Sequence, residues 1–380
     1  MMRRRLRIFF SVLAIIVVVL GVLLFLAYKL FVHTPSITEY ASFSDVPLYT
    51  WTHVNLSDET MCSEGSAYRF YVRRGESPNL IIHFAGGGAC WDAATCSQPI
   101  TLTHFSGFYF PTSWEIFPNV LNGILNNQNS ANPFHDWNAV YIPYCTADFH
   151  IGSADPTYTS ADNQALTVHH RGRQNVTEAL SWVLDTFPQP PTLLISGESA
   201  GGFGSIFWTP TIAAQYPASD IYQLADGVYL ETPLWDEIVH EAWQSDMLSV
   251  VGADLAGDAY RSYVAASTPN ITYLHINTLF DGTLLYFNSY LNGVSGDAAY
   301  VESWSQHMRA SMQQTAASGL NYYFYLTDYG LDPQTQLTPH TSISGPLFFD
   351  VTEDEVPLSQ WLRRIVIDGE RFSVGESFLP

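Results

Sequence analysis

The stretch Leu193–Gly204 constrains the fold of this chain more than any other part of the sequence. It reads Leu-Leu-Ile-Ser-Gly-Glu-Ser-Ala-Gly-Gly-Phe-Gly. The apolar run Thr192–Ser196 is typical of a buried strand, and Ser199 follows it at the centre of Gly-x-Ser-x-Gly, before a segment with helical character. Small residues permit a sharp strand-to-helix turn that holds a hydroxyl clear of the sheet. The pattern therefore predicts a nucleophilic serine; the alternative is a glycine-rich turn with only a packing role.

Apolar runs with strand character recur along the chain, and helical segments separate several of them. The runs lie at Ala67–Arg73, Asn79–Ala85, Asn138–Pro143, Gly227–Leu230, Ile271–Phe280 and Asn321–Leu326. Helical segments are expected at Asn175–Phe187, Leu234–Leu248 and Ala298–Ala317. The ends of the strands matter most, because ligands of open α/β sheets bind where strands end.

A glycine run follows the early strand at Asn79–Ala85. It consists of Gly86, Gly87 and Gly88, and Ala89-Cys90-Trp91 follows it. Backbone N–H groups can approach an anionic tetrahedral intermediate closely only where side chains do not intervene. The run therefore predicts an oxyanion-binding loop for Ser199, and the alternative is a tight turn without a ligand.

An activated serine needs a base and an acid that orients the base. Asp281 ends the strand at Ile271–Phe280, and His340 lies in the polar loop after the strand at Asn321–Leu326. Serine, acid and histidine in this chain order are typical of α/β-hydrolases. We expect Asp281 to be the acid and His340 the base; the alternatives are Asp328 for the acid and His307 for the base.

A third group of polar residues follows the strand at Asn138–Pro143. Asp148 and His150 lie there, and we expect them either at the rim of the site or in a surface loop. Trp91, just after the glycine run, is a further candidate for the rim. No residue pattern indicates a metal site, and Asp-x-His alone is a weak metal signal.

The four cysteines, Cys62, Cys90, Cys96 and Cys145, suit two disulfides in an exported protein. Three pairings are conceivable. We favour Cys90–Cys96, which would hold the glycine run, with Cys62–Cys145 as the second bond. The alternative, a zinc site of four thiolates, lacks a Cys-x-x-Cys spacing.

The N-terminus predicts a membrane segment. Arg3, Arg4, Arg5 and Arg7 precede an apolar run from about residue 8 to residue 27, long enough to cross a bilayer. We expect residues 1–32 to form a cytoplasmic tip and a signal-anchor, residues 33–44 a stalk, and residues 45–380 an extracytoplasmic domain. A cleaved signal peptide is the alternative and would make the protein secreted.

Charge excludes one large class of partners. The formal net charge is −21 over 380 residues, and the first 33 residues hold basic groups but no acidic ones. The remainder is therefore still more acidic and would repel nucleic acid. The oligomeric state cannot be inferred from these features.

Several of these motifs together resemble the pectin acetylesterase family, which also contains the Notum carboxylesterases. The resemblance rests on the glycine run with Cys90 and Trp91, the Gly-Glu-Ser-Ala-Gly-Gly turn, Cys62-Ser-x-Gly, and the segment from Asn277 to Asp281. It implies an α/β-hydrolase fold with a mainly parallel central sheet flanked by helices. It also implies a serine carboxylesterase that uses no metal or cofactor. The implied site residues are Ser199 as nucleophile, Asp281 as acid, His340 as base, and the amides of Gly87, Gly88 and Ala200 as oxyanion donors.

The expected substrate is an O-acetyl ester on an extracellular glycan. Two alternatives stay open. One is a membrane-tethered, catalytically inactive glycan-binding module, and the other is an esterase that acts on lipids or acylated proteins, as Notum does.

Overall fold

A central eight-stranded sheet organises the protein, in the order β1-β2-β4-β3-β7-β8-β9-β10. The computed structural model describes residues 18–19, 21–22, 37–101, 104, 106–113, 123–160, 163–249, 251–264 and 271–380. The strands of the sheet are β1 (Trp51–Asn55), β2 (Arg69–Arg73), β3 (Leu80–Phe84), β4 (Asn138–Ile142), β7 (Thr192–Glu198), β8 (Asp220–Asp226), β9 (Ile271–Thr278) and β10 (Tyr322–Thr327). β1 and β2 pair antiparallel, as do β2 and β4, and every other neighbouring pair is parallel.

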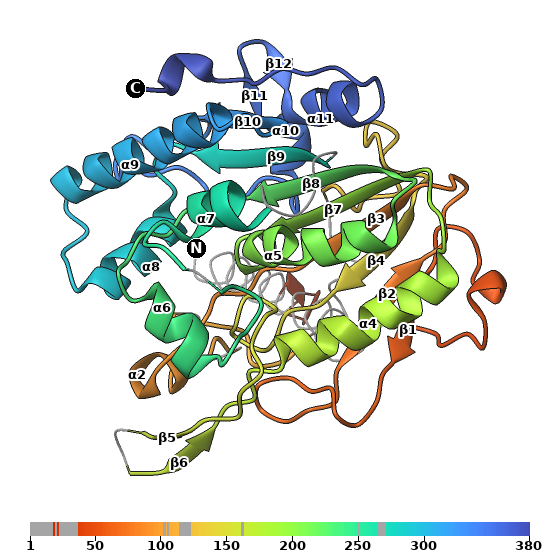
Figure 1. Cartoon of the computed structure of the whole chain (residues 1–380), viewed down its shortest axis with the longest axis horizontal. Helices are drawn as coiled ribbons and strands as arrows, with labels where there is room; N and C mark the ends of the chain where they lie inside the picture. The colour runs from red at the N-terminus through yellow and green to blue at the C-terminus, as the bar shows by residue number, and fades with distance from the viewer. Residues whose placement is uncertain are drawn as a thin grey trace, which may run out of the picture.

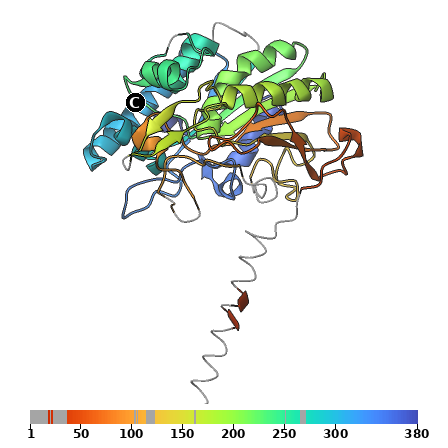
Figure 2. The ribbon, with the colours of Figure 1, turned by 90° about the horizontal axis from the view of Figure 1, so that it is seen from below.

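Helices cover both faces of this sheet (Figure 1). The helices α4 (Gly172–Thr186) and α5 (Ala200–Gln215) lie side by side on one face, and α11 (Leu358–Val366) lies on the other (Figure 2). α9 (Ala298–Ala316) packs beside β10, and α8 (Gly282–Asn292) follows β9. The expected α/β fold, with a mainly parallel sheet between helices, is therefore confirmed.

Shorter elements connect these layers. They are α2 (Ala93–Cys96), α6 (Trp235–Glu237), α7 (Leu255–Asp258), α10 (Leu347–Asp350) and two π-helical segments, Ile238–Ala242 and Ala259–Val264. The hairpin of β5 (Thr157–Thr159) and β6 (Ala165–Thr167) projects from the body (Figure 1). A last small hairpin joins β11 (Thr352–Glu353) to β12 (Val356–Pro357).

The strand predictions are correct except at one place. The strands at 69–73, 80–84, 138–142, 192–198, 271–278 and 322–327 agree with the expected runs to within two residues at each end. The strand expected at Gly227–Leu230 is wrong, because the strand is β8 (Asp220–Asp226). Gly227 has a φ of 68°, which ends the extended backbone and turns the chain out of the sheet.

Both predicted disulfides are present. Cys90 is bonded to Cys96 and Cys62 to Cys145. A thiolate zinc site is therefore excluded, because all four sulfurs are in disulfides. The Cys90–Cys96 bond closes the short loop directly after the glycine run, as expected.

The predicted membrane segment, residues 8–27, falls outside the described residues apart from 18, 19, 21 and 22. Among the helices that the structure describes, none combines the length and the apolar composition that crossing a bilayer requires.

Candidate active site

Ser199 occupies the sharp turn between β7 and α5. Its backbone has a φ of 53° and a ψ of −126°, a strained conformation for a residue with a side chain. Its N–H donates to the carbonyl oxygen of Asp226 at 2.8 Å, which ties the turn to the end of β8. A Cβ at Gly201 would overlap the carbonyl oxygens of Phe84 and Ala85, so α5 can begin this close to the sheet only with glycine there.

Ser199 opens onto a pocket at the carboxyl ends of the parallel strands. The pocket has a volume of about 570 Å³. Its lining includes the glycine run (Gly86, Gly87 and Gly88), Ser199 and His340. We call it the Ser199 pocket. Its other walls are Ile100, Ser106, Gly107, Phe108, Phe110, Glu198, Gly282, Thr283, Tyr286, Phe287, Thr341 and Ser344. The glycine run after β3 and the turn after β7 thus face one cavity.

Asp281 and His340 are in direct contact, as the sequence predicted. The Nδ1 atom of His340 lies 2.7 Å from Oδ2 of Asp281. The other carboxylate oxygen, Oδ1, accepts hydrogen bonds from the N–H groups of Thr283 and Leu284 at 3.0 and 2.9 Å, so Asp281 also caps α8. A carboxylate held in this way fixes the tautomer that carries a proton on Nδ1 and leaves Nε2 as an acceptor.

The Nε2 atom of His340 is buried and has no hydrogen-bond partner among the described residues. Ser199 and His340 line the same pocket, but no hydrogen bond joins them in the described structure. Catalytic hydrogen bonds are often long before substrate binds and shorten in the complex. The arrangement leaves an imidazole nitrogen without a partner on a residue that lines the same pocket as Ser199.

Surrounding charges change the pKa of His340. Burial alone would lower the pKa of the imidazole, but the nearby carboxylates of Asp281, Asp226 and Glu198 together raise it above the ordinary histidine value of 6.5. A raised pKa makes the neutral ring a stronger base.

Backbone amides without a partner lie close to Ser199: Gly87 and Gly88 line the same pocket, and Ala200 directly follows the serine. Within the described part of the chain, the N–H groups of Gly87, Gly88 and Ala200 donate no hydrogen bond. Ala200 is the first residue of α5, where a helix presents unpaired amides and the positive end of its dipole. Gly88 has a φ of 78°, and a side chain there would overlap the carbonyl of Phe108. Amides without a partner beside a serine are suited to bind an oxyanion.

Glu198, next to the serine, holds the glycine run in place. Its Oε1 atom accepts the Gly86 N–H at 2.9 Å. Its Oε2 atom lies 2.7 Å from Nε2 of the fully buried His83, whose Nδ1 contacts the hydroxyl of Ser196 at 2.9 Å. These contacts connect β3, β7 and the glycine run behind the nucleophile. The sequence did not indicate this role, because Glu198 looks only like the variable position of Gly-x-Ser-x-Gly.

Asp226 holds the loop that carries His340. Its Oδ2 atom accepts the N–H groups of Ser342 and Ile343 at 2.5 and 2.8 Å. Burial raises the pKa of this carboxyl to about 7. These contacts give Asp226 a structural role in the loop after β10.

The three rim candidates lie outside the Ser199 pocket. Asp148 is buried and accepts the amides of His150 and Gly172, at 3.1 and 2.8 Å. His150 is buried too, with its Nε2 atom 2.9 Å from the carbonyl oxygen of Ala85. Neither residue lines the pocket, and both hold backbone segments below it. Trp91 does not line the pocket either, but it contacts the ring of Phe108, which does.

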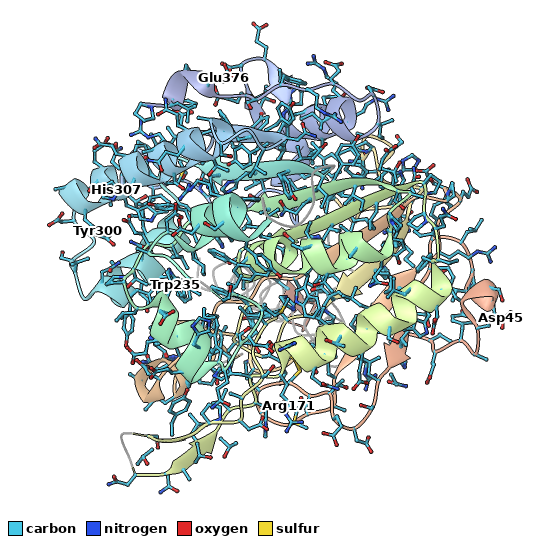
Figure 3. All side chains as sticks on the ribbon, in the orientation of Figure 1. Asp45, Arg171, Trp235, Tyr300, His307 and Glu376 are labelled. Carbon is cyan, nitrogen blue, oxygen red and sulfur yellow. A yellow bond between two sulfur atoms is a disulfide. The ribbon has the colours of Figure 1, made fainter. Side chains whose placement is uncertain are left out.

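The alternative base and acid lie elsewhere. His307 is on the outer side of α9 (Figure 3), where its Nδ1 atom is 3.0 Å from Oε2 of Glu231. Asp328 follows β10 and is exposed. Neither lines the Ser199 pocket.

The chain matches known esterases over much of its length. Residues 44–248 match the model of the family described as Pectinacetylesterase. The chain is 35% identical over 100 residues to palmitoleoyl-protein carboxylesterase NOTUM of Schmidtea mediterranea, covering 25% of this chain and 18% of that protein. It is 25% identical over 177 residues to pectin acetylesterase 7 of Arabidopsis thaliana, covering 45% of this chain and 42% of the relative.

A third relative, pectin acetylesterase 11 of Arabidopsis thaliana, is 30% identical over 120 residues, covering 30% of this chain and 29% of the relative. The chain thus spans less than half the length of each of these three relatives. The family match covers more than half of the present chain. The chain therefore belongs to the pectinacetylesterase family, a family of carboxylic ester hydrolases that act on acyl esters.

Proposed function

We propose that this protein is a serine carboxylesterase that removes O-acetyl groups from a glycan outside the cytoplasm. One observation carries the proposal: a histidine paired with a carboxylate at 2.7 Å lines the same pocket as the strained Ser199. The amides of Gly87, Gly88 and Ala200 add donors for a developing oxyanion. We also propose that the architecture is that of the α/β-hydrolases, since serine, acid and histidine follow the parallel strands β7, β9 and β10 in that order.

The proposed reaction has two steps. In the first, Nε2 of His340 takes the proton of the Ser199 hydroxyl as its oxygen attacks the ester carbonyl. The carbonyl oxygen becomes an oxyanion held by the loop and turn amides. The carbon–oxygen bond to the alcohol then breaks, and the alcohol leaves with the proton from His340.

In the second step, water replaces the alcohol. His340 takes a proton from the water as its oxygen attacks the acyl-enzyme, and the same amides hold the second oxyanion. The bond to Ser199 breaks, the serine regains its proton, and the carboxylic acid is released. Asp281 keeps the imidazole oriented and stabilises its positive charge in both steps.

The cellular setting is part of the same proposal. Four arginines before the apolar run at residues 8–27 support a single-pass anchor with a cytoplasmic N-terminus. Two disulfides support a catalytic domain on the oxidising side of the membrane.

A second candidate function is hydrolysis of longer acyl esters, including acylated proteins. The observation in its favour is the aromatic character of the Ser199 pocket, which Phe108, Phe110 and Phe287 line. One relative is also a palmitoleoyl-protein carboxylesterase. A catalytically inactive glycan-binding module is the third candidate, and it would use the same surface without turnover.

A panel of p-nitrophenyl acetate, butyrate and palmitate separates these candidates. We expect acetate to have the highest kcat/KM, and Ser199→Ala to lose at least about 10³-fold in kcat. A fluorophosphonate probe should label the native protein and leave Ser199→Ala unlabelled. Preference for palmitate would favour the second candidate. A folded native protein that neither turns over esters nor reacts with the probe would contradict the esterase proposal.

A further inference from the structure

The surface beside the Ser199 pocket carries a cluster of aromatic side chains that the reaction does not use. Tyr286 and Tyr290 stand on α8 with 48% and 40% of their surface exposed. Residues four apart lie on the same helix face, one turn or about 5.4 Å from each other. Trp91, half-buried, stands next to Tyr290, with ring centroids 6.2 Å apart. We call Trp91, Tyr286 and Tyr290 the aromatic platform.

All three rings of the platform contact one buried aromatic ring. The fully buried ring of Phe108 lies under it, with centroid distances of 4.6 Å to Tyr290, 5.9 Å to Tyr286 and 6.1 Å to Trp91. The Cys90–Cys96 disulfide packs in the same small core as Phe108. Rings that are fixed in this way lose little conformational freedom when a ligand covers them.

The platform is continuous with the Ser199 pocket. Tyr286 and Phe108 line the pocket, whereas Tyr290 lies one turn farther along α8 and does not. The first residue before α8 is Asp281, whose carboxylate caps the helix and holds His340. A chain whose ester group lies at Ser199 would therefore extend over Tyr286 first and Tyr290 next.

The chemistry of the platform fits sugar rings better than an acyl chain. Within the described residues, neither phenol hydroxyl of Tyr286 and Tyr290 has a hydrogen-bond partner. Their rings offer flat apolar faces with polar edges, as the two sides of a pyranose ring require. An acyl chain would leave those hydroxyls unused.

A carboxylate lies at the edge of this surface. Burial raises the pKa of Tyr290, and the nearby charge of Asp92 raises it further. Asp92 directly follows Trp91, and its Oδ1 atom accepts the N–H and the hydroxyl of Thr95 at 2.7 and 2.8 Å. Its negative charge repels an anionic sugar, in a chain whose net charge is already −21. The local charge thus favours an uncharged ligand.

We propose that the aromatic platform is a subsite for neutral sugar units that adjoin the acetylated sugar of a glycan chain. The inference rests on the proposed esterase function and narrows its substrate to an O-acetylated, uncharged polysaccharide. Tyr286 stacks on the sugar nearest Ser199, and Tyr290 with Trp91 holds the next one.

The test compares a substrate that reaches the platform with one that does not. Initial rates are measured on p-nitrophenyl acetate and on acetylated xylo-oligosaccharides for the native protein, Tyr290→Ala and Tyr290→Phe. We expect Tyr290→Ala to lower the ratio of kcat/KM on the oligosaccharide to that on p-nitrophenyl acetate by about tenfold, mainly through KM. Tyr290→Phe keeps the ring and should restore most of the ratio.

Ile367→Ala is a matched control, since Ile367 is 44% exposed directly after α11 and lies outside the platform. It should leave the ratio at the native value. A ratio for Tyr290→Ala within twofold of the native one would overturn the subsite while leaving the esterase proposal intact. Higher kcat/KM on acetylated galacturonan oligosaccharides than on the neutral ones would overturn the preference for uncharged sugars.

Binding to the Ser199→Ala protein separates the two proposals. Quenching of tryptophan fluorescence by the xylo-oligosaccharides should weaken about tenfold in affinity when Tyr290→Ala is added. If the native protein shows no ester turnover but this binding and its loss remain, the esterase proposal fails and the subsite stands. Unchanged binding in the double variant would reject the subsite by itself.

Discussion

At the residue scale, His340 depends on charges from three different parts of the chain. Asp281, Asp226 and Glu198 come from the ends of three parallel strands or the turns after them, and together they raise the pKa of the imidazole. A histidine base works only when its ring is neutral, and a raised pKa means that the proton leaves at a higher pH.

The raised pKa of His340 predicts how kcat/KM depends on pH. As the pH falls, kcat/KM on p-nitrophenyl acetate should fall with a midpoint above 6.5, because the ring becomes protonated. Asp281→Asn should move the midpoint to lower pH and reduce kcat by about 10³-fold or more, since one carboxylate charge and the orienting contact are lost. A midpoint at or below 6.5 in the native protein would count against His340 as the base.

Glu198 gives a second prediction at this scale. Glu198→Ala removes the acceptor of the Gly86 N–H and leaves His83 without its carboxylate, so the glycine run loses this support. We expect kcat to fall by about 10²-fold with little change in KM, because only the transition state uses the oxyanion donors.

Glu198→Gln is the matched variant, since its amide oxygen can still accept the Gly86 N–H. It should keep kcat within about fivefold of the native value. If both variants lost activity equally, the charge of Glu198 rather than its hold on the loop would explain the loss. Native kcat in Glu198→Ala would refute the role altogether.

Some residues of the candidate site can be predicted from a short stretch of sequence, and others cannot. Ser199, the glycine run and the Asp281–His340 pair follow from short patterns and chain order, so the sequence pointed to them, although their catalytic roles stay predictions. Glu198 depends on partners from another strand, and Trp91 reaches the pocket only through Phe108. Contacts of this kind arise when distant segments pack together, and no local pattern encodes them.

At the element scale, buried parallel strands were the most predictable part. β3, β4 and β9 are buried along their whole length, so they read as continuous apolar runs. β8 was misplaced because its ends are Asp220 and Asp226, whereas the apolar residues after Gly227 are buried without being in the sheet. The residues after Gly227 are therefore buried but not part of a strand, and an apolar run alone does not distinguish the two cases.

The two disulfides should contribute differently to this framework. Cys62 and Cys145 are 83 residues apart and Cys90 and Cys96 only 6. Loop entropy then predicts that Cys62→Ser with Cys145→Ser costs about 4.5 kcal/mol of stability and Cys90→Ser with Cys96→Ser about 2 kcal/mol. Urea unfolding under non-reducing conditions measures both.

For catalytic activity, we expect the loss of the Cys90–Cys96 disulfide to have the larger effect. The Cys90–Cys96 bond packs beside Phe108 and directly after the glycine run, so its loss should reduce kcat more than loss of Cys62–Cys145 does, in variants that remain folded. Equal kcat values would indicate that the glycine run is held by Glu198 and the sheet alone.

At the scale of the whole molecule, the chain combines an acidic body with a basic, apolar N-terminus. The sequence predicts the anchor, and the structure describes only residues 18, 19, 21 and 22 of that segment. We expect the full chain to sediment with membranes and to resist extraction by high salt. A variant lacking residues 1–32, exported with a cleavable signal, should appear in the soluble fraction with kcat/KM within twofold of the full chain. If the full-length sequence is expressed and the protein is recovered in the soluble fraction without its N-terminal segment, the segment is a cleaved signal peptide instead.

The position of Asp281 limits how the protein can open for a large substrate. One of its carboxylate oxygens fixes the start of α8 and the other fixes the imidazole. Any swing of that helix would therefore separate the carboxylate of Asp281 from the ring of His340. Room for a bulky ligand would then have to come from other lining residues of the Ser199 pocket, such as Ile100, Ser106 and Phe110. If the proposed esterase mechanism holds, ligands could then exchange along that wall while the contact between Asp281 and His340 stays intact.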